Sequence, residues 1–130
     1  MAKVVLDASA VLALLQKETG HEVVRAALCG EDCFISAANL AEAATKLHQV
    51  LPDPVKVRKL LDIPNLAVRP VTGEDAYRAA ELDAIGKPLG LSLGDRLCLA
   101  AGILEGADVL TTDRVWAQLG TAGPKVRLAR

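Results

Sequence analysis

The sequence predicts an α/β domain in which helices cover a parallel sheet. Short apolar segments alternate with longer segments of helical periodicity, which is typical of strand–helix–strand units with right-handed crossovers. Apolar residues make up 52% of the chain and aromatic residues only 2%, so Leu, Val, Ile and Ala must form the core. A chain of 130 residues fits one domain. We therefore expect residues 1–130 to form a single domain around a mainly parallel sheet of about 4–5 strands.

The first quarter of the chain predicts two strands separated by two helices. Residues 3–7 read as a short buried strand that leads directly into a helix over residues 8–17, where apolar side chains recur at helical spacing. Gly20 ends that helix, and residues 21–28 predict another. The second buried strand is expected at residues 33–36, with the sequence Cys-Phe-Ile-Ser.

An Ala-rich helix is predicted next, over residues 37–51. It has one apolar stripe, and Pro52 and Pro54 end it. A short helix over residues 55–61 and a third strand over residues 66–71 follow.

Two capping boxes mark the helices of the second half. Thr72 begins a helix that reaches about residue 85. Residues 86–90 look flexible because they contain two glycines and a proline. Ser92 then begins a helix that ends near residue 105, although Gly94 is a weak helix former in its first turn.

The C-terminal part predicts two further strands. Residues 107–111 return to a strand, and Asp113 caps a short helix that contains Trp116. Residues 126–128 are the candidate for the last strand.

Charge and aromatic content exclude a general nucleic-acid-binding surface. The chain has 15 Lys and Arg residues against 16 Asp and Glu residues, a formal net charge of −1, so any polyanion must be held locally. Its only aromatic residues are Phe34, Tyr77 and Trp116, too few for the stacking platform of a single-strand binding module.

Cysteine usage indicates a reducing compartment. Cys29, Cys33 and Cys98 are odd in number, and we expect no signal peptide because Asp7 interrupts the short apolar start, so the predicted location is cytoplasmic. No second Cys or His pair has a spacing that would complete a zinc site. No apolar run approaches the ~18 residues of a membrane span.

Four acidic residues, Asp7, Glu42, Asp95 and Asp113, lie within otherwise apolar segments. Asp7 directly follows the first strand and Asp113 closely follows a later one, so both should face the carboxyl edge of a parallel sheet, where ligand sites form. If all four carboxylates meet, they repel one another unless a cation lies among them, and hard ions such as Mg²⁺ or Mn²⁺ prefer oxygen ligands. Such clusters typically serve phosphoryl transfer.

Each acid also has an ordinary structural explanation. Asp7 and Asp113 stand where helix N-caps belong, and Asp95 can complete a capping box in which Asp replaces Glu. Glu42 can pair with Lys46 one helical turn later. Their joint presence, rather than any single position, favours a metal site.

Four segments each place one of the acids among apolar residues. They are Val4-Val-Leu-Asp7-Ala-Ser9, Asn39-Leu-Ala-Glu42-Ala, Leu91-Ser-Leu-Gly-Asp95-Arg-Leu-Cys-Leu-Ala and Leu110-Thr-Thr-Asp113-Arg-Val-Trp116. In order and spacing they resemble the acidic motifs of PIN domains, and they are most similar to those of VapC-type toxins of bacterial toxin–antitoxin pairs. The resemblance covers residues 3 to about 118. It implies a three-layer α/β/α PIN-like fold with a central, mainly parallel sheet.

The resemblance also implies an Mg²⁺- or Mn²⁺-dependent endoribonuclease in which a metal-activated water attacks an RNA phosphodiester, leaving a 5′-phosphate and a 3′-hydroxyl. Asp7 and Asp95 would be direct metal ligands, and Glu42 and Asp113 would bind directly or through water. Ser9 and Thr111 match hydroxyl positions that support the acids, or serve as capping and strand-end residues. The basic residues near these motifs could hold flanking RNA phosphates or be merely solvated; they are Lys87, Arg96 and Arg114.

The implied partners are a VapB-like antitoxin that covers the metal site and a second copy of the chain in a homodimer. Two other classes remain open. One is a catalytically silent PIN-fold binding module that acts through protein partners. The other is a receiver or haloacid-dehalogenase-like domain, which needs a second acid close to Asp7, where Ala8, Ser9 and Ala10 stand instead.

Overall fold

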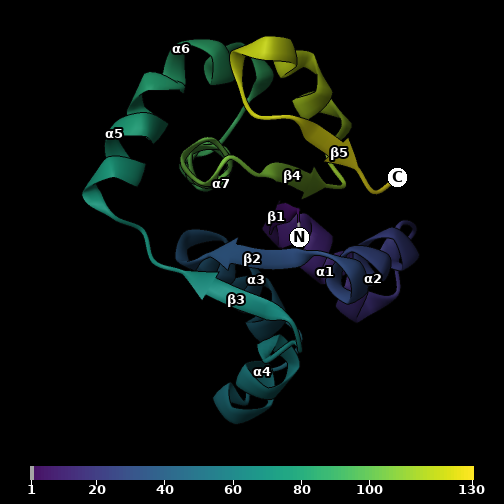
Figure 1. The fold of residues 1–130 in the computed structure, drawn as a ribbon. Helices are drawn as coiled ribbons and strands as arrows, with labels where there is room; N and C mark the ends of the chain where they lie inside the picture. The colour runs from purple at the N-terminus through teal and green to yellow at the C-terminus, as the bar shows by residue number, and fades with distance from the viewer. Residues whose placement is uncertain (1) are drawn as a thin grey trace.

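The sheet has the predicted parallel arrangement (Figure 1). The structure, a computed structural model, describes residues 2–130. Within these residues, the sheet has the strand order β3-β2-β1-β4-β5, and every neighbouring pair is parallel. The strands are β1 (Lys3–Leu6), β2 (Asp32–Ser36), β3 (Leu66–Arg69), β4 (Asp108–Thr111) and β5 (Val126–Leu128). The prediction of an α/β fold with a mainly parallel sheet is confirmed.

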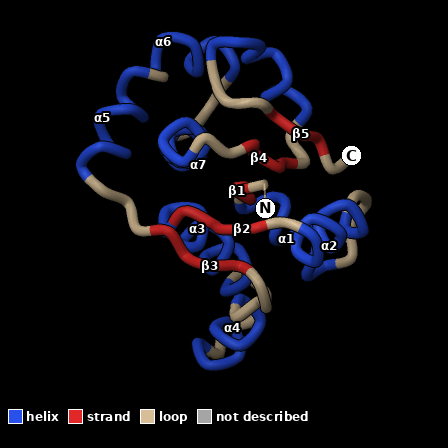
Figure 2. The backbone as a smooth tube through the Cα atoms, in the orientation of Figure 1, coloured by secondary structure: helices blue, strands red, loops and turns tan. Residues whose placement is uncertain are grey.

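Helices cover both faces of this sheet, which gives the expected three layers (Figure 2). One face carries α1 (Ala8–Gln16), α2 (His21–Gly30), α3 (Ala37–His48) and α4 (Pro54–Leu61). The other carries α5 (Gly73–Glu81), α6 (Asp83–Gly86), α7 (Leu93–Glu105) and the 3₁₀ segments η1 (Lys87–Leu89) and η2 (Arg114–Ala122). Among residues 2–130, no helix is both long and apolar enough to cross a membrane.

Alternating side chains of the central strand supply the cores of both outer layers. Val4 and Leu6 of β1 pack with α1 and α2, whereas Val5 packs on the opposite side against α7. All three side chains are fully buried. A strand that is apolar on both faces is typical of a sheet covered by helices on both sides.

Several predicted helices differ in detail from the structure. The first helix ends at Gln16 with Lys17 in the left-handed conformation, so the prediction that Gly20 ends it is wrong, and Gly20 instead precedes α2. The helix expected over residues 37–51 ends at His48, because the residue before Pro52 is disfavoured in the α conformation. The helix expected to reach residue 85 ends at Glu81, and the short helix α6 follows it. The segment that contains Trp116 is 3₁₀ rather than α, and Gly120, with φ of 57°, interrupts it.

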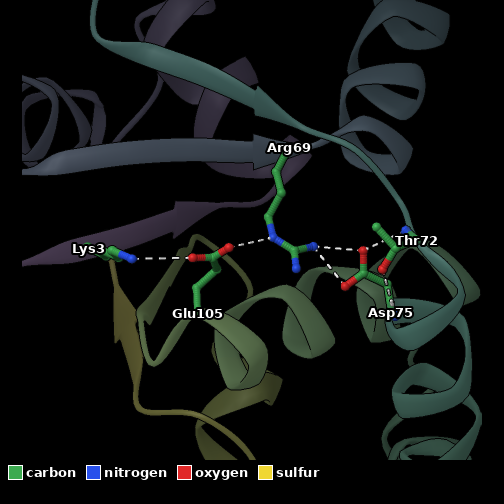
Figure 3. A network of polar contacts seen from close by, with 5 residues as sticks. All are labelled: Lys3, Arg69, Thr72, Asp75 and Glu105. Atoms are coloured by element: carbon green, nitrogen blue, oxygen red, sulfur yellow. Dashed lines mark hydrogen bonds and ion pairs between the residues drawn. The ribbon is translucent and has the colours of Figure 1, made fainter.

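A polar network joins the sheet to the helices α5 and α7 on one of its faces (Figure 3). Arg69, at the end of β3, donates to both oxygens of Asp75 at 2.8 and 2.7 Å and to Glu105 at 3.0 Å. Glu105 also pairs with Lys3, and the Asp75 side chain accepts from the Thr72 backbone. Burial by itself would raise the pKa of Asp75, but the hydrogen bonds from Arg69 hold that pKa below its usual value. Arg69 therefore fixes the chain where it leaves β3 and begins α5.

Replacing Arg69 with Met should lower the free energy of unfolding by roughly 3 kcal/mol at pH 7, because the carboxylate of Asp75 stays buried and loses its partner. The folded-state pKa of Asp75 is depressed in the native protein, so this contribution exists above the unfolded-state pKa and disappears as pH falls through the folded-state value. The loss on mutation should therefore shrink toward pH 4. Urea unfolding at both pH values measures it.

Arg78→Met is the control, since Arg78 pairs with Glu81 across an exposed turn of α5. That exposed pair should contribute less than about 1 kcal/mol. Equal losses of unfolding free energy in the two variants would show that the buried Arg69–Asp75 pair stabilises the fold no more than an exposed pair.

Candidate functional site

The structure brings the four predicted acids together at one edge of the sheet. Asp7, Glu42, Asp95 and Asp113 line one cavity of about 170 Å³. The other lining residues are Ala8, Ser9, Lys46 and Trp116. The acids come from four separate segments: the loops after β1 and β4, the middle of α3 and the first turn of α7. Asp7 and Asp113 meet because β1 and β4 are parallel neighbours that end at the same edge.

A larger groove of about 810 Å³ lies between α3 and α4. Its walls are mostly apolar, with Leu40, Val57 and Leu61 among them, and none of the four acids lines it. The smaller cavity, lined by the four acids, gathers the charged oxygen atoms that a hard cation prefers.

Asp7 is the most buried member of the quartet, with 4% of its surface exposed. It caps the N-terminus of α1, and its Oδ1 accepts from the backbone N–H of Ala10 at 2.9 Å. Burial raises the pKa of Asp7 to about 6, and the charge of Asp95 adds to this effect, while hydrogen bonds from Thr111, Ala10 and Ser9 oppose it. Without a cation, Asp7 is therefore an acid that ionises only near neutral pH.

Two hydroxyl groups hold the carboxylate of Asp7. Thr111 Oγ1 donates to Asp7 Oδ2 at 2.6 Å, and Ser9 Oγ lies 2.7 Å from Oδ1 and 2.9 Å from Oδ2. The same hydroxyls also accept backbone hydrogen bonds, Thr111 Oγ1 from Asp113 and Ser9 Oγ from Thr112. The end of β4 is therefore tied directly to the acid that follows β1.

Asp95 and Asp113 cap helices, as their sequence positions suggest. Asp95 Oδ2 accepts from the backbone N–H of Ser92 at 2.9 Å in a capping box, and Asp113 Oδ1 accepts from Val115 at 3.1 Å. A carboxylate has two oxygens and about four lone-pair sites, so one capping bond leaves capacity for an ion. The structural explanation and the metal-ligand explanation are therefore compatible for both acids.

Glu42 is not paired with Lys46. The ion pairs of residues 2–130 do not include this pair, and Glu42 Oε1 instead accepts from Asn39 Nδ2 at 2.7 Å. Lys46 lines the same cavity as the acids. Glu42 therefore does not form the surface ion pair that its sequence position allowed. It is half-buried and lies on the face of α3 that lines the cavity.

Sequence reasoning did not assign Asn39, Lys46 or Trp116 to the site. Asn39 and Lys46 are three residues before and four after Glu42, so they share its face of α3. This spacing was the available signal. Trp116 gave none, because a lone aromatic residue in a short helix is normally part of the core, and here it is 1% exposed.

The three predicted RNA-contacting cations are placed differently from one another. Arg96 does not line the acidic cavity: its Nη1 donates to the carbonyl oxygen of Ala79 at 2.8 Å, and Nη2 lies 3.9 Å from Asp83. Lys87 is exposed and also lies 3.8 Å from Asp83. Arg114 is exposed one residue after Asp113, beside a separate polar hollow.

The carboxylates line one cavity but do not form a closed coordination shell. Within residues 2–130, no three side chains of His, Cys, Asp or Glu stand close enough to one another to be a formed metal site. Ionised carboxylates repel one another, which disfavours closer approach in the absence of a cation. The four acids therefore line the same cavity without being arranged in a coordination geometry.

Comparison with known proteins identifies the family. The sequence model of the PIN-domain family matches residues 4–121, almost the whole chain. The chain belongs to the PIN-domain family. No curated protein matches the sequence of this PIN domain.

Solved structures share the fold at low sequence identity. VapBC2 from Rickettsia felis, bound to a promoter DNA fragment, has a TM-score of 0.75 at 16% identity, with 97% of this chain and 98% of that chain covered. DNA-bound VapBC from Salmonella typhimurium has a TM-score of 0.75 at 18% identity, with both chains covered to 100%. VapC20 of Mycobacterium tuberculosis, described as a sarcin–ricin loop cleaving toxin, has a TM-score of 0.71 at 18% identity, with 90% and 95% covered.

Replacing Asp7 with Asn should stabilise the metal-free PIN domain more at pH 7.5 than at pH 4.5. The folded-state pKa of Asp7, about 6, lies above the ordinary value of 3.8. Its carboxyl group therefore stabilises the fold below pH 3.8, and this contribution is lost as pH rises through about 6. Asn removes the buried charge, and the shift sets an upper limit of about 3 kcal/mol. Thermal unfolding in a chelator measures the difference.

Asp53→Asn is the matched control, since Asp53 caps α4 through the backbone N–H of Val55 and lies outside the cavity. Asn is as good an N-cap as Asp, so this exchange should change stability little at either pH. A pH-independent effect of Asp7→Asn would contradict the assignment of a strained, buried carboxylate to Asp7.

Proposed function

We propose that this PIN domain is a metal-dependent endoribonuclease, the toxin of a VapBC-like toxin–antitoxin pair, that hydrolyses RNA phosphodiester bonds. The observation that carries the proposal is the convergence of Asp7, Glu42, Asp95 and Asp113 on one cavity. Burying Asp7 among other acids costs stability in the absence of a cation. An arrangement that is unfavourable without an ion is best explained by an ion that it binds.

The donor atoms suit Mg²⁺ or Mn²⁺. Besides the indole of Trp116, the polar side chains that line the cavity are the carboxylates, the Ser9 hydroxyl and the Lys46 ammonium, with no imidazole or thiol among them. Cys98 lies near three of the acids, but burial, and then the charges of Asp7, Asp95 and Glu42, raise the pKa of its thiol well above the usual value. Cys98 does not line the cavity, so carboxylate and hydroxyl oxygens are the metal ligands that the cavity offers.

In this proposal Asp7 and Asp95 hold the ion directly, and Glu42 and Asp113 bind directly or through water. When bound, Mg²⁺ or Mn²⁺ activates the attacking water and neutralises phosphate charge. Thr111 and Ser9 orient Asp7 by donating to its two oxygens. No side chain of the protein forms a covalent bond to RNA.

The RNA backbone is proposed to lie across the mouth of the cavity. Lys46 lines the cavity itself and Arg114 lies beside Asp113, so both can contact phosphates next to the scissile bond. Lys87 is free to contact a more distant phosphate, because its exposed pair with Asp83 contributes little. Arg96 is not included, since its guanidinium is committed to α5.

The alternative is a catalytically silent PIN-fold module that acts only through protein partners. The intact quartet argues against it, because ordinary structural roles can explain each acid singly but do not explain why all four line one cavity. A receiver-like site is disfavoured as well, since Ala8 and Ser9 are the residues beside Asp7 in the cavity and neither supplies a second acid.

Cleavage of single-stranded and structured RNA should require Mg²⁺ or Mn²⁺, and Asp7→Asn and Asp95→Asn should each lower kcat/KM by at least about 100-fold, since each removes a proposed direct ligand. The measurement is the initial rate on a labelled RNA with either ion and with a chelator. Both substitutions keep a side-chain oxygen for the capping bond, so the fold should survive.

Asp53→Asn makes the same chemical change at an N-cap outside the cavity and should cleave as the native protein does. Undiminished cleavage by both quartet variants would exclude this active site. Absence of cleavage of any RNA by the native chain would favour the silent binding module.

The partner proposal rests on the similar structures, several of which are toxin–antitoxin complexes. Expression of the native chain should arrest bacterial growth, and co-expression of the product of a small neighbouring reading frame should relieve the arrest. Asp7→Asn should not be toxic, because it lacks the proposed activity. Equal toxicity of Asp7→Asn and the native chain would show that growth arrest does not depend on the proposed RNA cleavage. Light scattering of the purified chain tests the proposed homodimer.

A further inference from the structure

Position 94 has no room for a side chain, because Glu42 occupies the space that a Cβ atom would need. Gly94 stands in the first turn of α7 and is not among the residues with positive φ, so its backbone does not require glycine. A Cβ atom at this position would lie 2.5 Å from Cδ and 2.6 Å from Oε1 of Glu42. Glycine inside a helix costs about 1 kcal/mol relative to alanine. This destabilising glycine stands where the carboxylate of Glu42 lies against the backbone of α7.

Asn39 holds Glu42 in that place. Its side chain is fully buried, and Nδ2 donates to Glu42 Oε1 at 2.7 Å and to the carbonyl oxygen of Gly94 at 3.1 Å. Both partners are acceptors, so the amide group must turn its nitrogen toward them. Asn39 Oδ1 is buried without a hydrogen-bond partner within residues 2–130, which makes this asparagine costly as a packing residue.

The bonds of Asn39 decide between two positions for Glu42. Glu42 and Lys46 are four residues apart on α3, a spacing at which opposite charges attract. Asp7 and Asp95 line the same cavity as Lys46, and in the absence of a cation their charges repel Glu42. A free Glu42 side chain would therefore turn toward Lys46, and the amide of Asn39 opposes that movement.

We propose that Asn39 and Gly94 are positioning residues that keep the carboxylate of Glu42 against the first turn of α7, so that Glu42 and Asp95 form one prearranged half of the metal site. This inference rests on the proposed function, because it assigns a role toward the same ion. Its physical basis is preorganisation: a long side chain that is already fixed loses less conformational freedom when the ion binds.

Gly94→Ala tests the inference with little damage to the fold. The atoms that the new Cβ meets belong to the end of a flexible side chain, so Glu42 can move away while α7 keeps its place. Gly73→Ala is the matched control, since Gly73 also lies in the first turn of a helix with a capping box, but a Cβ there meets nothing within 4 Å.

Mn²⁺ affinity is the readout, measured by calorimetry and by fluorescence quenching of Trp116, which is the single tryptophan of the chain and lines the cavity. Gly94→Ala and Glu42→Ala should each weaken Mn²⁺ binding by about 10-fold or more, and Asn39→Ala should do the same. Gly73→Ala should bind as the native chain does. Thermal unfolding confirms that each variant is folded.

The double variant Glu42→Ala/Gly94→Ala decides between positioning and a merely structural effect. If Gly94 acts through Glu42, the double variant binds Mn²⁺ as weakly as Glu42→Ala alone, whereas independent effects would multiply to about 100-fold. Multiplying effects, or native affinity in Gly94→Ala, would overturn the inference and leave the proposed function intact. Absence of Mn²⁺ binding by the native chain would overturn both.

Discussion

The buried carboxylate of Asp7 is the constraint on which the rest of the site depends. It lies where the two central neighbouring strands β1 and β4 end, and it accepts from the start of α1 and from the hydroxyl of Thr111 at the end of β4. These bonds offset part of the cost of burial, but not all of it, since the pKa of Asp7 stays raised. The same atoms therefore connect β1, β4 and α1. They also leave a buried carboxylate that a nearby cation would stabilise.

The acids show how one residue can serve structure and chemistry together. Asp7, Asp95 and Asp113 each accept a backbone N–H at a helix start, so each helix orients its own carboxylate. A helix N-terminus carries partial positive charge, which eases the crowding of several anions at one edge of the sheet. Glu42 lacks this support because it lies in the middle of α3, and Asn39 supplies a donor to it instead.

Local pattern was enough to predict the strands, most helices and the caps at Asp7, Thr72, Ser92 and Asp113, because these depend on neighbouring residues. The end of α3 and the division after α5 were missed, since they depend on the residue before a proline and on how the chain crosses to the next helix. Gly94 is the clearest limit. Sequence alone marks it as a weak helix former, and only the three-dimensional arrangement shows that Glu42, 52 positions earlier (94 − 42), occupies the space.

The distribution of cations also follows from packing that sequence cannot reveal. Arg69, Arg96 and Arg127 are all committed to contacts within the fold, including the pairs of Arg127 with Asp108 and Glu31. Few positive groups remain near the acidic cavity of a chain whose net charge is −1. Without a cation, a cavity of this kind repels a phosphate, whereas a cation among the carboxylates reverses the local field. In the proposed nuclease, metal binding and RNA binding are therefore coupled, because the ion that activates water also makes the cavity attractive to the substrate.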